Sequence, residues 1–245
     1  MKTLKTLSVI AVLIASLGLT SCIDDGDSRN YLAGHVTIEG TYPNYTLYHR
    51  QGYIIKLTPS SVSELTGGKG FGTNKRGFFN VSFRDEDVKY NYIEGTEKLR
   101  DITIENAELI SGSYVTTLNI MAHETAESKN LLVADSIFAI NRYEDFWIDH
   151  GYLNIVVEAP YSIIDGGYVY PTMNVIYKEE DIKENAITLT MLYNRHTSKD
   201  AKKSIGSFIT AYPIKNLISA VPGNDSITVT VRTDGADRQV TKMAR

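Results

Sequence analysis

Three side chains near the middle of the chain form the most suggestive local combination of chemical groups. Trp147, the only tryptophan in the sequence, stands between Asp145 and Asp149. Alternate residues of a strand face the same side, so these three side chains would share one face, opposite Phe146 and Ile148. If those two apolar residues face the core, an exposed indole flanked by carboxylates can stack on a sugar ring. The alternative is that the indole packs against a neighbouring strand or another domain.

No other group of residues has the spacing of a catalytic or metal-binding site. The five histidines are scattered and lack the i, i+4 pairing or the Cys/His spacing of zinc sites. In the glycine cluster 67–72, Lys69 is followed by Gly70 rather than by Ser or Thr opening a helix, so a P-loop is excluded. No Gly-x-Ser-x-Gly elbow is present. We therefore predict no catalytic residue, no metal, no cofactor and no enzymatic activity. Carboxylates that meet only on folding, as in an envelope hydrolase, remain the enzymatic alternative.

The only cysteine, Cys22, follows a segment typical of an exported lipoprotein. Lys2 and Lys5 precede an apolar run over 7–19, which leads into Leu19-Thr20-Ser21-Cys22. A basic start, an apolar region of about 7–15 residues and a small-residue cleavage site define a signal peptide. The run is shorter than the ~20 residues that cross a bilayer. Because the last four residues resemble a bacterial lipobox, we predict that residues 1–21 are removed and that Cys22 carries the lipid anchor.

Residues 22–30 are polar and acidic, which predicts a tether between the anchor and the folded chain. Eight extended residues reach at most about 26 Å, so the folded part stays close to the membrane. The aspartates at 24, 25 and 27 either solvate a linker or resemble the surface-export signal of lipoproteins in Gram-negative gut anaerobes. We predict an outer-membrane, lipid-anchored protein that is exposed at the cell surface.

The charge balance excludes nucleic acid as a partner. Without residues 1–21 the chain keeps 23 basic and 29 acidic side chains. Such a surface repels phosphate backbones, whose binding requires clustered Lys and Arg. With Cys22 lipidated, no thiol remains for a disulfide, so the fold must depend on its hydrophobic core.

Stretches rich in Val, Ile, Thr and Tyr with a period of two predict an all-β fold. In the first domain, 31–121, about five strands favour a small OB-like barrel, because closure removes exposed strand edges. We expect a loop over 60–77, five strands over 31–39, 45–49, 53–58, 78–83 and 102–110, and a further short strand over 114–120. The sixteen tyrosines are typical of strand surfaces.

The second domain, 131–245, has the pattern of a β-sandwich. The polar stretch 122–130 can hold a turn or two of helix and is the expected domain boundary. Asp149-His150-Gly151 and Asp165-Gly166-Gly167 are expected turns. We expect strands over 137–143, 146–148, 152–158, 168–177, 187–193, 208–212 and 227–232.

Several of these segments together resemble the NigD-like lipoproteins. They are the lipobox with its acidic tail, Gly34-His35-Val36, the barrel strand 75–83 and the stretches 135–137, 147–148 and 152–155. The resemblance spans nearly the whole chain. It implies an N-terminal OB-type domain followed by a C-terminal β-sandwich. The family is named from a bacteriocin-production locus, and the resemblance implies no biochemical activity and no set of functional residues.

These observations predict a non-enzymatic binding or accessory lipoprotein. It would contact the membrane through its anchor and bind an envelope protein, a peptide or a glycan, and the family name suggests a link to bacteriocin production or immunity. The alternative is a carbohydrate-binding component of a surface glycan-uptake system, which rests on Trp147 and the tyrosine content.

Overall fold

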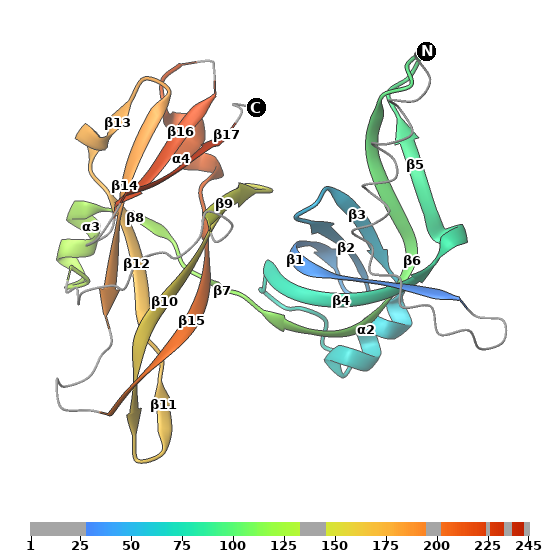
Figure 1. Ribbon diagram of the computed structural model, residues 1–245, viewed down its shortest axis with the longest axis horizontal. Helices are drawn as coiled ribbons and strands as arrows, with labels where there is room; N and C mark the ends of the chain where they lie inside the picture. Colours follow the sequence, from blue (N-terminus) through green and yellow to red (C-terminus); the bar gives the residue numbers. More distant parts are fainter. Residues whose placement is uncertain (1–27, 133–145, 195–201, 224–225, 233–236, 243–245) are drawn as a thin grey trace, which may run out of the picture. The chain divides into compact units, whose positions relative to one another are not determined.

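The computed structural model describes residues 28–132, 146–194, 202–223, 226–232 and 237–242. The chain forms two compact units, Met1–Tyr114 and Val115–Arg245, and each is described by itself (Figure 1). Nearly all of the regular structure in both is β-strand, which confirms the predicted all-β fold. Within the described residues, no helix is long and apolar enough to cross a membrane.

The first unit contains a closed five-stranded barrel. Its strand order is β3-β2-β1-β4-β6-β5, and a parallel pairing of β3 with β6 closes the first five. This is the strand order of an OB fold, with a helix between the third and fourth barrel strands, so the predicted OB-like barrel is confirmed. The elements are β1 (Arg29–Thr41), β2 (Asn44–His49), β3 (Tyr53–Leu57), α2 (Pro59–Thr66), β4 (Arg76–Arg84), a 3-10 turn (Asp85–Asp87), β5 (Val88–Tyr92) and β6 (Leu99–Tyr114).

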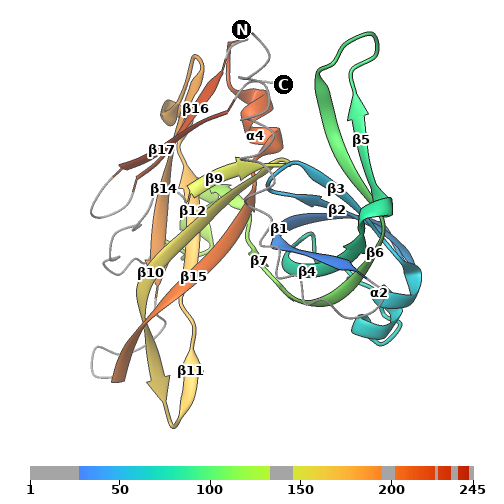
Figure 2. The same ribbon diagram turned by 45° about the vertical axis from the view of Figure 1, so that its right-hand side comes forward.

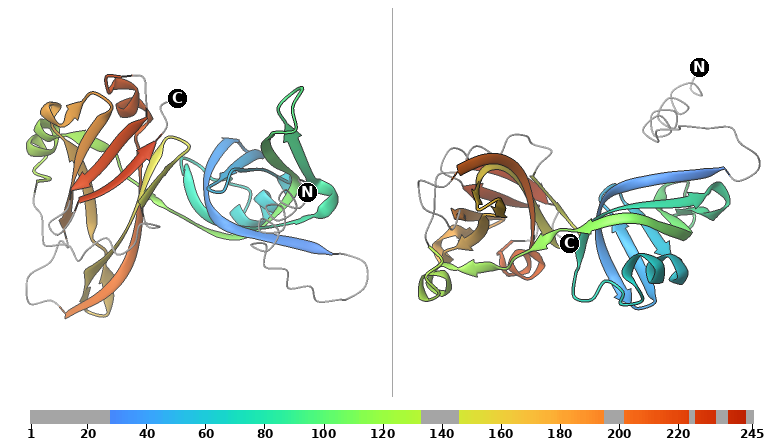
Figure 3. Two further views of the ribbon diagram at one scale, coloured as in Figure 1. Left: turned by 45° about the horizontal axis from the view of Figure 1, so that its top comes forward. Right: turned by 90° about the horizontal axis from the view of Figure 1, so that it is seen from below.

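Helix α2 corrects the expectation of a loop over 60–77. Pro59 occupies the first turn, where its missing N–H costs no hydrogen bond, and Gly67 ends the helix with φ +59°. Val62 is fully buried in the barrel core, so the helix packs against the barrel (Figure 3). Eight residues are too few for a clear 3.6-residue periodicity, which explains why only the terminal Pro and Gly signal the helix.

A long β-hairpin extends from the barrel and was not expected from the sequence. The first residues of β6 pair with β5, so that Tyr90 lies opposite Ile102 (Figures 1 and 2). Strand β6 is therefore longer than the predicted 102–110 and reaches Tyr114. The charged residues around the hairpin obscure the alternating pattern of its strands.

In the first unit, the ring of Phe79 leaves no room for a side chain at positions 77 and 112. Its ring is 3% exposed and lies over Gly77 and Gly112, where added Cβ atoms would lie 2.2 and 1.8 Å from ring carbons. Gly112 is directly opposite Phe79 across β4 and β6. An aromatic ring that covers a cross-strand glycine in this way pins the strand register.

The second unit is a β-sandwich, as predicted. One sheet has the order β11-β10-β15-β7 with β9 also paired to β10, and the other has the order β17-β16-β14-β12-β8 with β13 paired to β14. The elements are β7 (Thr116–Thr117), β8 (Ile120–Ala122), α3 (His123–Ser128), β9 (Phe146–Asp149), β10 (Tyr152–Ile164), β11 (Gly167–Val169), β12 (Thr172–Tyr177), a 3-10 turn (Glu179–Asp181), β13 (Ile182–Lys183), β14 (Ala186–Asn194), β15 (Lys202–Pro213), α4 (Lys215–Ala220), β16 (Ile227–Arg232) and β17 (Asp237–Lys242).

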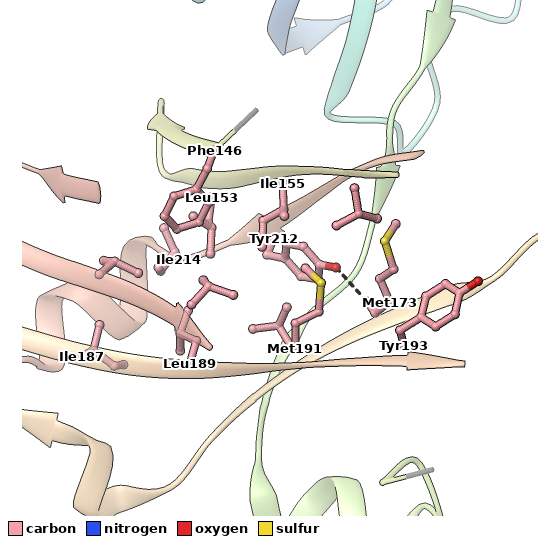
Figure 4. Packing of buried hydrophobic residues seen from close by; sticks show 14 of the residues in the cluster. Phe146, Leu153, Ile155, Met173, Ile187, Leu189, Met191, Tyr193, Tyr212 and Ile214 are labelled. Atoms are coloured by element: carbon pink, nitrogen blue, oxygen red, sulfur yellow. Dashed lines mark hydrogen bonds between the residues drawn. The ribbon is translucent and has the colours of Figure 1, made fainter. Parts of the chain in front are cut away.

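The core of the sandwich lies between these two sheets. Figure 4 shows Leu153 and Ile155 of β10 on one side and Leu189 and Met191 of β14 on the other. Tyr212 of β15 spans the layer, and its hydroxyl donates a hydrogen bond of 2.7 Å to the Met173 carbonyl oxygen in β12. A buried polar group is thereby satisfied across the core.

Three sequence expectations for this unit have different outcomes. The polar stretch 122–130 contains the expected short helix, α3. The single strand expected over 168–177 is wrong: it is divided into β11 and β12 near Pro171, which has no N–H to donate to a sheet ladder. The strand expected over 137–143 lies outside the described residues.

Candidate functional site

The side chain of Trp147, the centre of the sugar hypothesis, is buried in the structure. Phe146 packs in the sandwich core and Ile148 packs against it, as the strand alternation predicts. Trp147 therefore belongs to the opposite face of β9, but its side chain is only 8% exposed. An indole that is covered to this extent does not offer the open stacking surface that the sugar hypothesis requires, and it agrees with the alternative in which the indole packs against neighbouring residues.

Of the two acids beside Trp147, only Asp149 lies within the described residues. Asp149 ends β9, and its Oδ1 atom accepts a hydrogen bond of 2.7 Å from the Nδ2 atom of the buried Asn154. His150 and Gly151 follow with φ values of +42° and +79°, as in a two-residue hairpin turn. Asp149 thus stabilises the predicted turn between β9 and β10. Asp145 lies outside the described residues, as do Cys22 and the predicted signal peptide.

A cluster of four aromatic rings in the second unit is the better candidate. We call Tyr161, Tyr168, Tyr170 and Phe208 the tyrosine platform. Neighbouring ring centroids lie 5.7 Å apart for Tyr161 and Tyr168, 6.4 Å for Tyr168 and Tyr170, 6.2 Å for Tyr170 and Phe208, and 5.9 Å for Tyr161 and Phe208. The four contacts form a closed circuit. Tyr168 and Tyr170 are 60% and 65% exposed, respectively.

Strand register places the platform on the inner face of one sheet. Val157, a core residue, pairs with Phe208, and Ile163 pairs with Tyr168. Paired residues and alternate residues along a strand share a face, so these side chains continue the face that forms the sandwich core. Strands β10 and β15 have 13 and 12 residues, whereas β12 and β14 in the facing sheet have six and nine. The β10–β11 hairpin accordingly extends beyond the ends of β12 and β14 (Figures 1 and 2).

A glycine gives the platform its shape. A Cβ atom at Gly206 would lie 3.1 Å from Cε1 of Tyr161 and 3.2 Å from Cζ of Phe208. The Tyr161 ring therefore lies across the neighbouring strand at Gly206 instead of standing away from the sheet. This packing fixes the two inner rings, against which the two exposed tyrosines rest.

An open pocket of about 270 Å³ in the first unit is a weaker candidate. Its charged residues already bind one another: Arg29 with Glu108, and Arg84 with Glu86 at 3.6 Å. The Asn106 side chain also donates a hydrogen bond to Asp87 at 2.9 Å. Such half-exposed pairs contribute little stability, and the charged side chains of the pocket already have polar partners within the protein. The lining residues are Arg29, Thr58, Phe83, Arg84, Glu86, Asp87, Asn106 and Glu108.

The pKa values of Asp101 and Tyr212 are shifted, and both side chains have structural roles. Hydrogen bonds from the Arg100 and Asn91 side chains hold the pKa of the Asp101 carboxyl below its ordinary value, and Asp101 lies on the exposed β5–β6 hairpin. Burial raises the pKa of the Tyr212 phenol well above its ordinary value, so this core hydroxyl stays protonated. Among the described residues, no three His, Cys, Asp or Glu side chains gather as a metal-ligand set.

Comparisons with solved structures agree with this two-domain architecture. A NigD-like immunity protein from Bacteroides caccae is 14% identical, with 87% of this chain and 94% of that chain covered and a TM-score of 0.50. A "putative lipoprotein" from Bacteroides fragilis is 11% identical, with coverages of 88% and 99% and a TM-score of 0.53. A protein of unknown function from Bacteroides vulgatus is 16% identical, with coverages of 88% and 92% and a TM-score of 0.51. A scan of family models and a search of curated proteins find no match.

These likenesses define the class of fold. The chain is a two-domain all-β protein with an OB-type barrel followed by a sandwich. More particularly, it has the fold of the NigD-like immunity protein from Bacteroides caccae, which confirms the sequence resemblance at the level of the fold.

The tyrosine platform is not apparent in the sequence. Its rings come from β10, the β11–β12 segment and β15, and they meet only once the strands pair. The one local signal is Tyr168-Val169-Tyr170, two tyrosines on the same face of one segment next to Pro171.

Proposed function

We propose that this chain is a lipid-anchored, non-enzymatic binding protein of the cell envelope, and that its ligand docks on the tyrosine platform. The observation that carries the proposal is the exposure of Tyr168 and Tyr170 on a packed four-ring cluster. Exposed aromatic clusters on otherwise polar surfaces mark interaction sites, and tyrosine supplies much contact area with little conformational entropy to lose.

The anchor and its location rest on the sequence and on the likeness of fold. Residues 1–22 have the features of a lipoprotein signal ending at Cys22. One structural neighbour is named as a lipoprotein and another as an immunity protein. The proposed outer-membrane placement and exposure at the cell surface are supported by the acidic residues after Cys22, which resemble a surface-export signal. A role in bacteriocin production or immunity follows from the family name.

Labelling and fractionation test the anchor. The wild-type chain should incorporate radiolabelled palmitate and sediment with the outer membrane, whereas Cys22→Ser should do neither. Protease added to intact cells should degrade the wild-type protein if it faces outward. Membrane association that persists in unlabelled Cys22→Ser protein would contradict the anchor.

Affinity capture tests the binding role. The full chain should retain a component of detergent-solubilised envelopes, and a Tyr168→Ala/Tyr170→Ala variant should lose it. Tyr90→Ala removes a comparably exposed tyrosine from the first unit, 59% exposed, and should retain it. The released component should be chemically unchanged after prolonged contact with the protein. Equal recovery by the double variant would exclude the platform as the binding surface.

The bacteriocin link has its own test. A strain that lacks the gene should differ from its parent in bacteriocin sensitivity or output, and complementation should restore the parental behaviour. Unchanged sensitivity and output would exclude this role and leave the binding proposal in place.

A further inference from the structure

We infer that the tyrosine platform binds uncharged sugar rings, so that the ligand of this protein is a neutral glycan. The inference rests on the proposed function, because it names the ligand class of the same surface. It replaces Trp147, which is covered, with a surface on another part of the second unit.

Ring geometry is the first argument. Tyr168 and Tyr170 are near-parallel, with an interplanar angle of 29°, and both are largely exposed. Tyr161 and Phe208 meet their neighbours edge-to-face at 60–84° and hold the exposed rings from below. Aromatic faces carry partial negative charge, and the C–H bonds on one face of a pyranose ring present weakly positive hydrogens. The two rings are stacked on each other with centroids 6.4 Å apart, so each keeps one outward face that can pack against a sugar ring.

Charge is the second argument. The platform itself consists of uncharged rings. Around the platform, Glu158 faces the opposite side of the sheet, Asp165 lies at the hairpin turn, and Lys202 pairs with Ile163, a register position on the platform side. Ser204 pairs with Tyr161, so it lies on the platform side and is half-buried. Hydroxyl groups of this serine and of the exposed tyrosines can donate and accept hydrogen bonds. Aromatic faces surrounded by hydroxyls match a ligand with apolar ring faces and hydroxyl edges.

The same features disfavour the other ligands of aromatic surfaces. Single-stranded nucleic acid also stacks on tyrosine, but its binding requires a basic groove along the backbone. The chain without residues 1–21 has an excess of acidic side chains instead.

Calorimetry with defined oligosaccharides tests the inference on the purified full chain in detergent. The probes are cellohexaose, mannohexaose, xylohexaose and the anionic hexagalacturonate. At least one neutral hexaose should bind more tightly than hexagalacturonate. Tyr168→Ala and Tyr170→Ala should each weaken that binding by about tenfold, as expected for truncation of a central aromatic contact. Tyr170→Phe keeps the ring and should stay within about threefold of wild type, and Tyr90→Ala should have no effect. Circular dichroism should show that all variants are folded.

Two results would overturn the inference. One is the absence of binding by every neutral hexaose at about 1 mM, together with ring-dependent capture of an envelope protein, in which case the proposed binding function stands and its glycan ligand does not. The other is neutral-hexaose binding that is unchanged in the Tyr168→Ala/Tyr170→Ala variant, which would place the sugar site elsewhere. If no envelope component of any kind is captured, the proposed function fails as well.

Discussion

Replacing Gly112 with alanine should destabilise the first unit through a single steric contact. The new Cβ atom would lie 1.8 Å from Cδ1 of Phe79. Carbon atoms in contact lie about 3.5–4.0 Å apart, so the ring would have to move by about 2 Å. Phe79 cannot move freely, because it packs against Phe71 and Tyr114 with centroid distances of 5.3 and 6.2 Å.

The size of the effect can be bounded from both sides. Forcing an extra methyl group into a packed core costs about 1–3 kcal/mol. Complete loss of the Phe79 contacts would cost about 3–5 kcal/mol, the range for truncating a buried phenylalanine to alanine. Alanine also restricts the unfolded chain, which returns about 0.4–1 kcal/mol. We therefore expect Gly112→Ala to lower the free energy of unfolding by about 2–3 kcal/mol.

The single tryptophan allows the unfolding of the two units to be followed by different signals. Trp147 belongs to the second unit, so its fluorescence reports on the sandwich, whereas far-UV circular dichroism reports on both units. With a urea dependence of about 1–3 kcal/mol/M for a small unit, the dichroism transition of the barrel should move to lower urea by about 0.7–3 M. The tryptophan transition should stay in place. Ser111→Ala changes the neighbouring exposed residue and should shift neither transition by more than about 0.5 kcal/mol.

A double-mutant cycle identifies the cause. In a Phe79→Ala background the space above residue 112 is empty, so Gly112→Ala should be nearly neutral, and the coupling energy should be about 2–3 kcal/mol. A steric clash with Phe79 is excluded if Gly112→Ala alone costs less than about 0.5 kcal/mol, or if its cost is the same with and without the Phe79 ring.

Three further predictions concern other parts of the chain. Gly34→Ala would place a Cβ atom 2.1 Å from Nε2 of the buried His49, and it should lower barrel stability by about 2 kcal/mol. In a His49→Ala background the same change should cost little. Equal costs in urea titrations of the two backgrounds would exclude the clash. The pKa of Asp101 is lowered on folding, so its contribution to stability is present above the pKa of the unfolded chain and is lost as the pH falls through the pKa of the folded chain. An NMR titration should show that Arg100→Ala raises the pKa of Asp101. An unchanged pKa would exclude the Arg100 hydrogen bond as a cause of the shift. Tyr212→Phe removes the hydroxyl that donates to the buried Met173 carbonyl oxygen, and it should lower the stability of the sandwich, followed by tryptophan fluorescence, by about 1–2 kcal/mol. An unchanged unfolding midpoint would show that this hydrogen bond contributes nothing to stability.

Local patterns predicted the features that depend on neighbouring residues. Alternating apolar residues predicted the strands, and Asp149-His150-Gly151 predicted the turn between β9 and β10, where residues 150 and 151 both have positive φ. Helix α2 was missed because the only evidence for it is a proline at its start and a glycine at its end. The glycines below Phe79 could not be explained from sequence, because the ring covers a residue on another strand.

The tyrosine platform could not be predicted from the alternation of apolar residues along the strands. Residues 157, 159, 161 and 163 of β10 follow one period-two pattern, and nothing in that pattern separates core positions from exposed ones. The difference lies in the facing sheet: six residues of β12 span about 20 Å, whereas thirteen residues of β10 span about 43 Å. The inner face of the longer strands is therefore covered over part of its length, and Tyr168 and Tyr170 lie where the cover ends. In a sandwich with strands of unequal length, the same apolar pattern builds a core at one end and an exposed aromatic surface at the other.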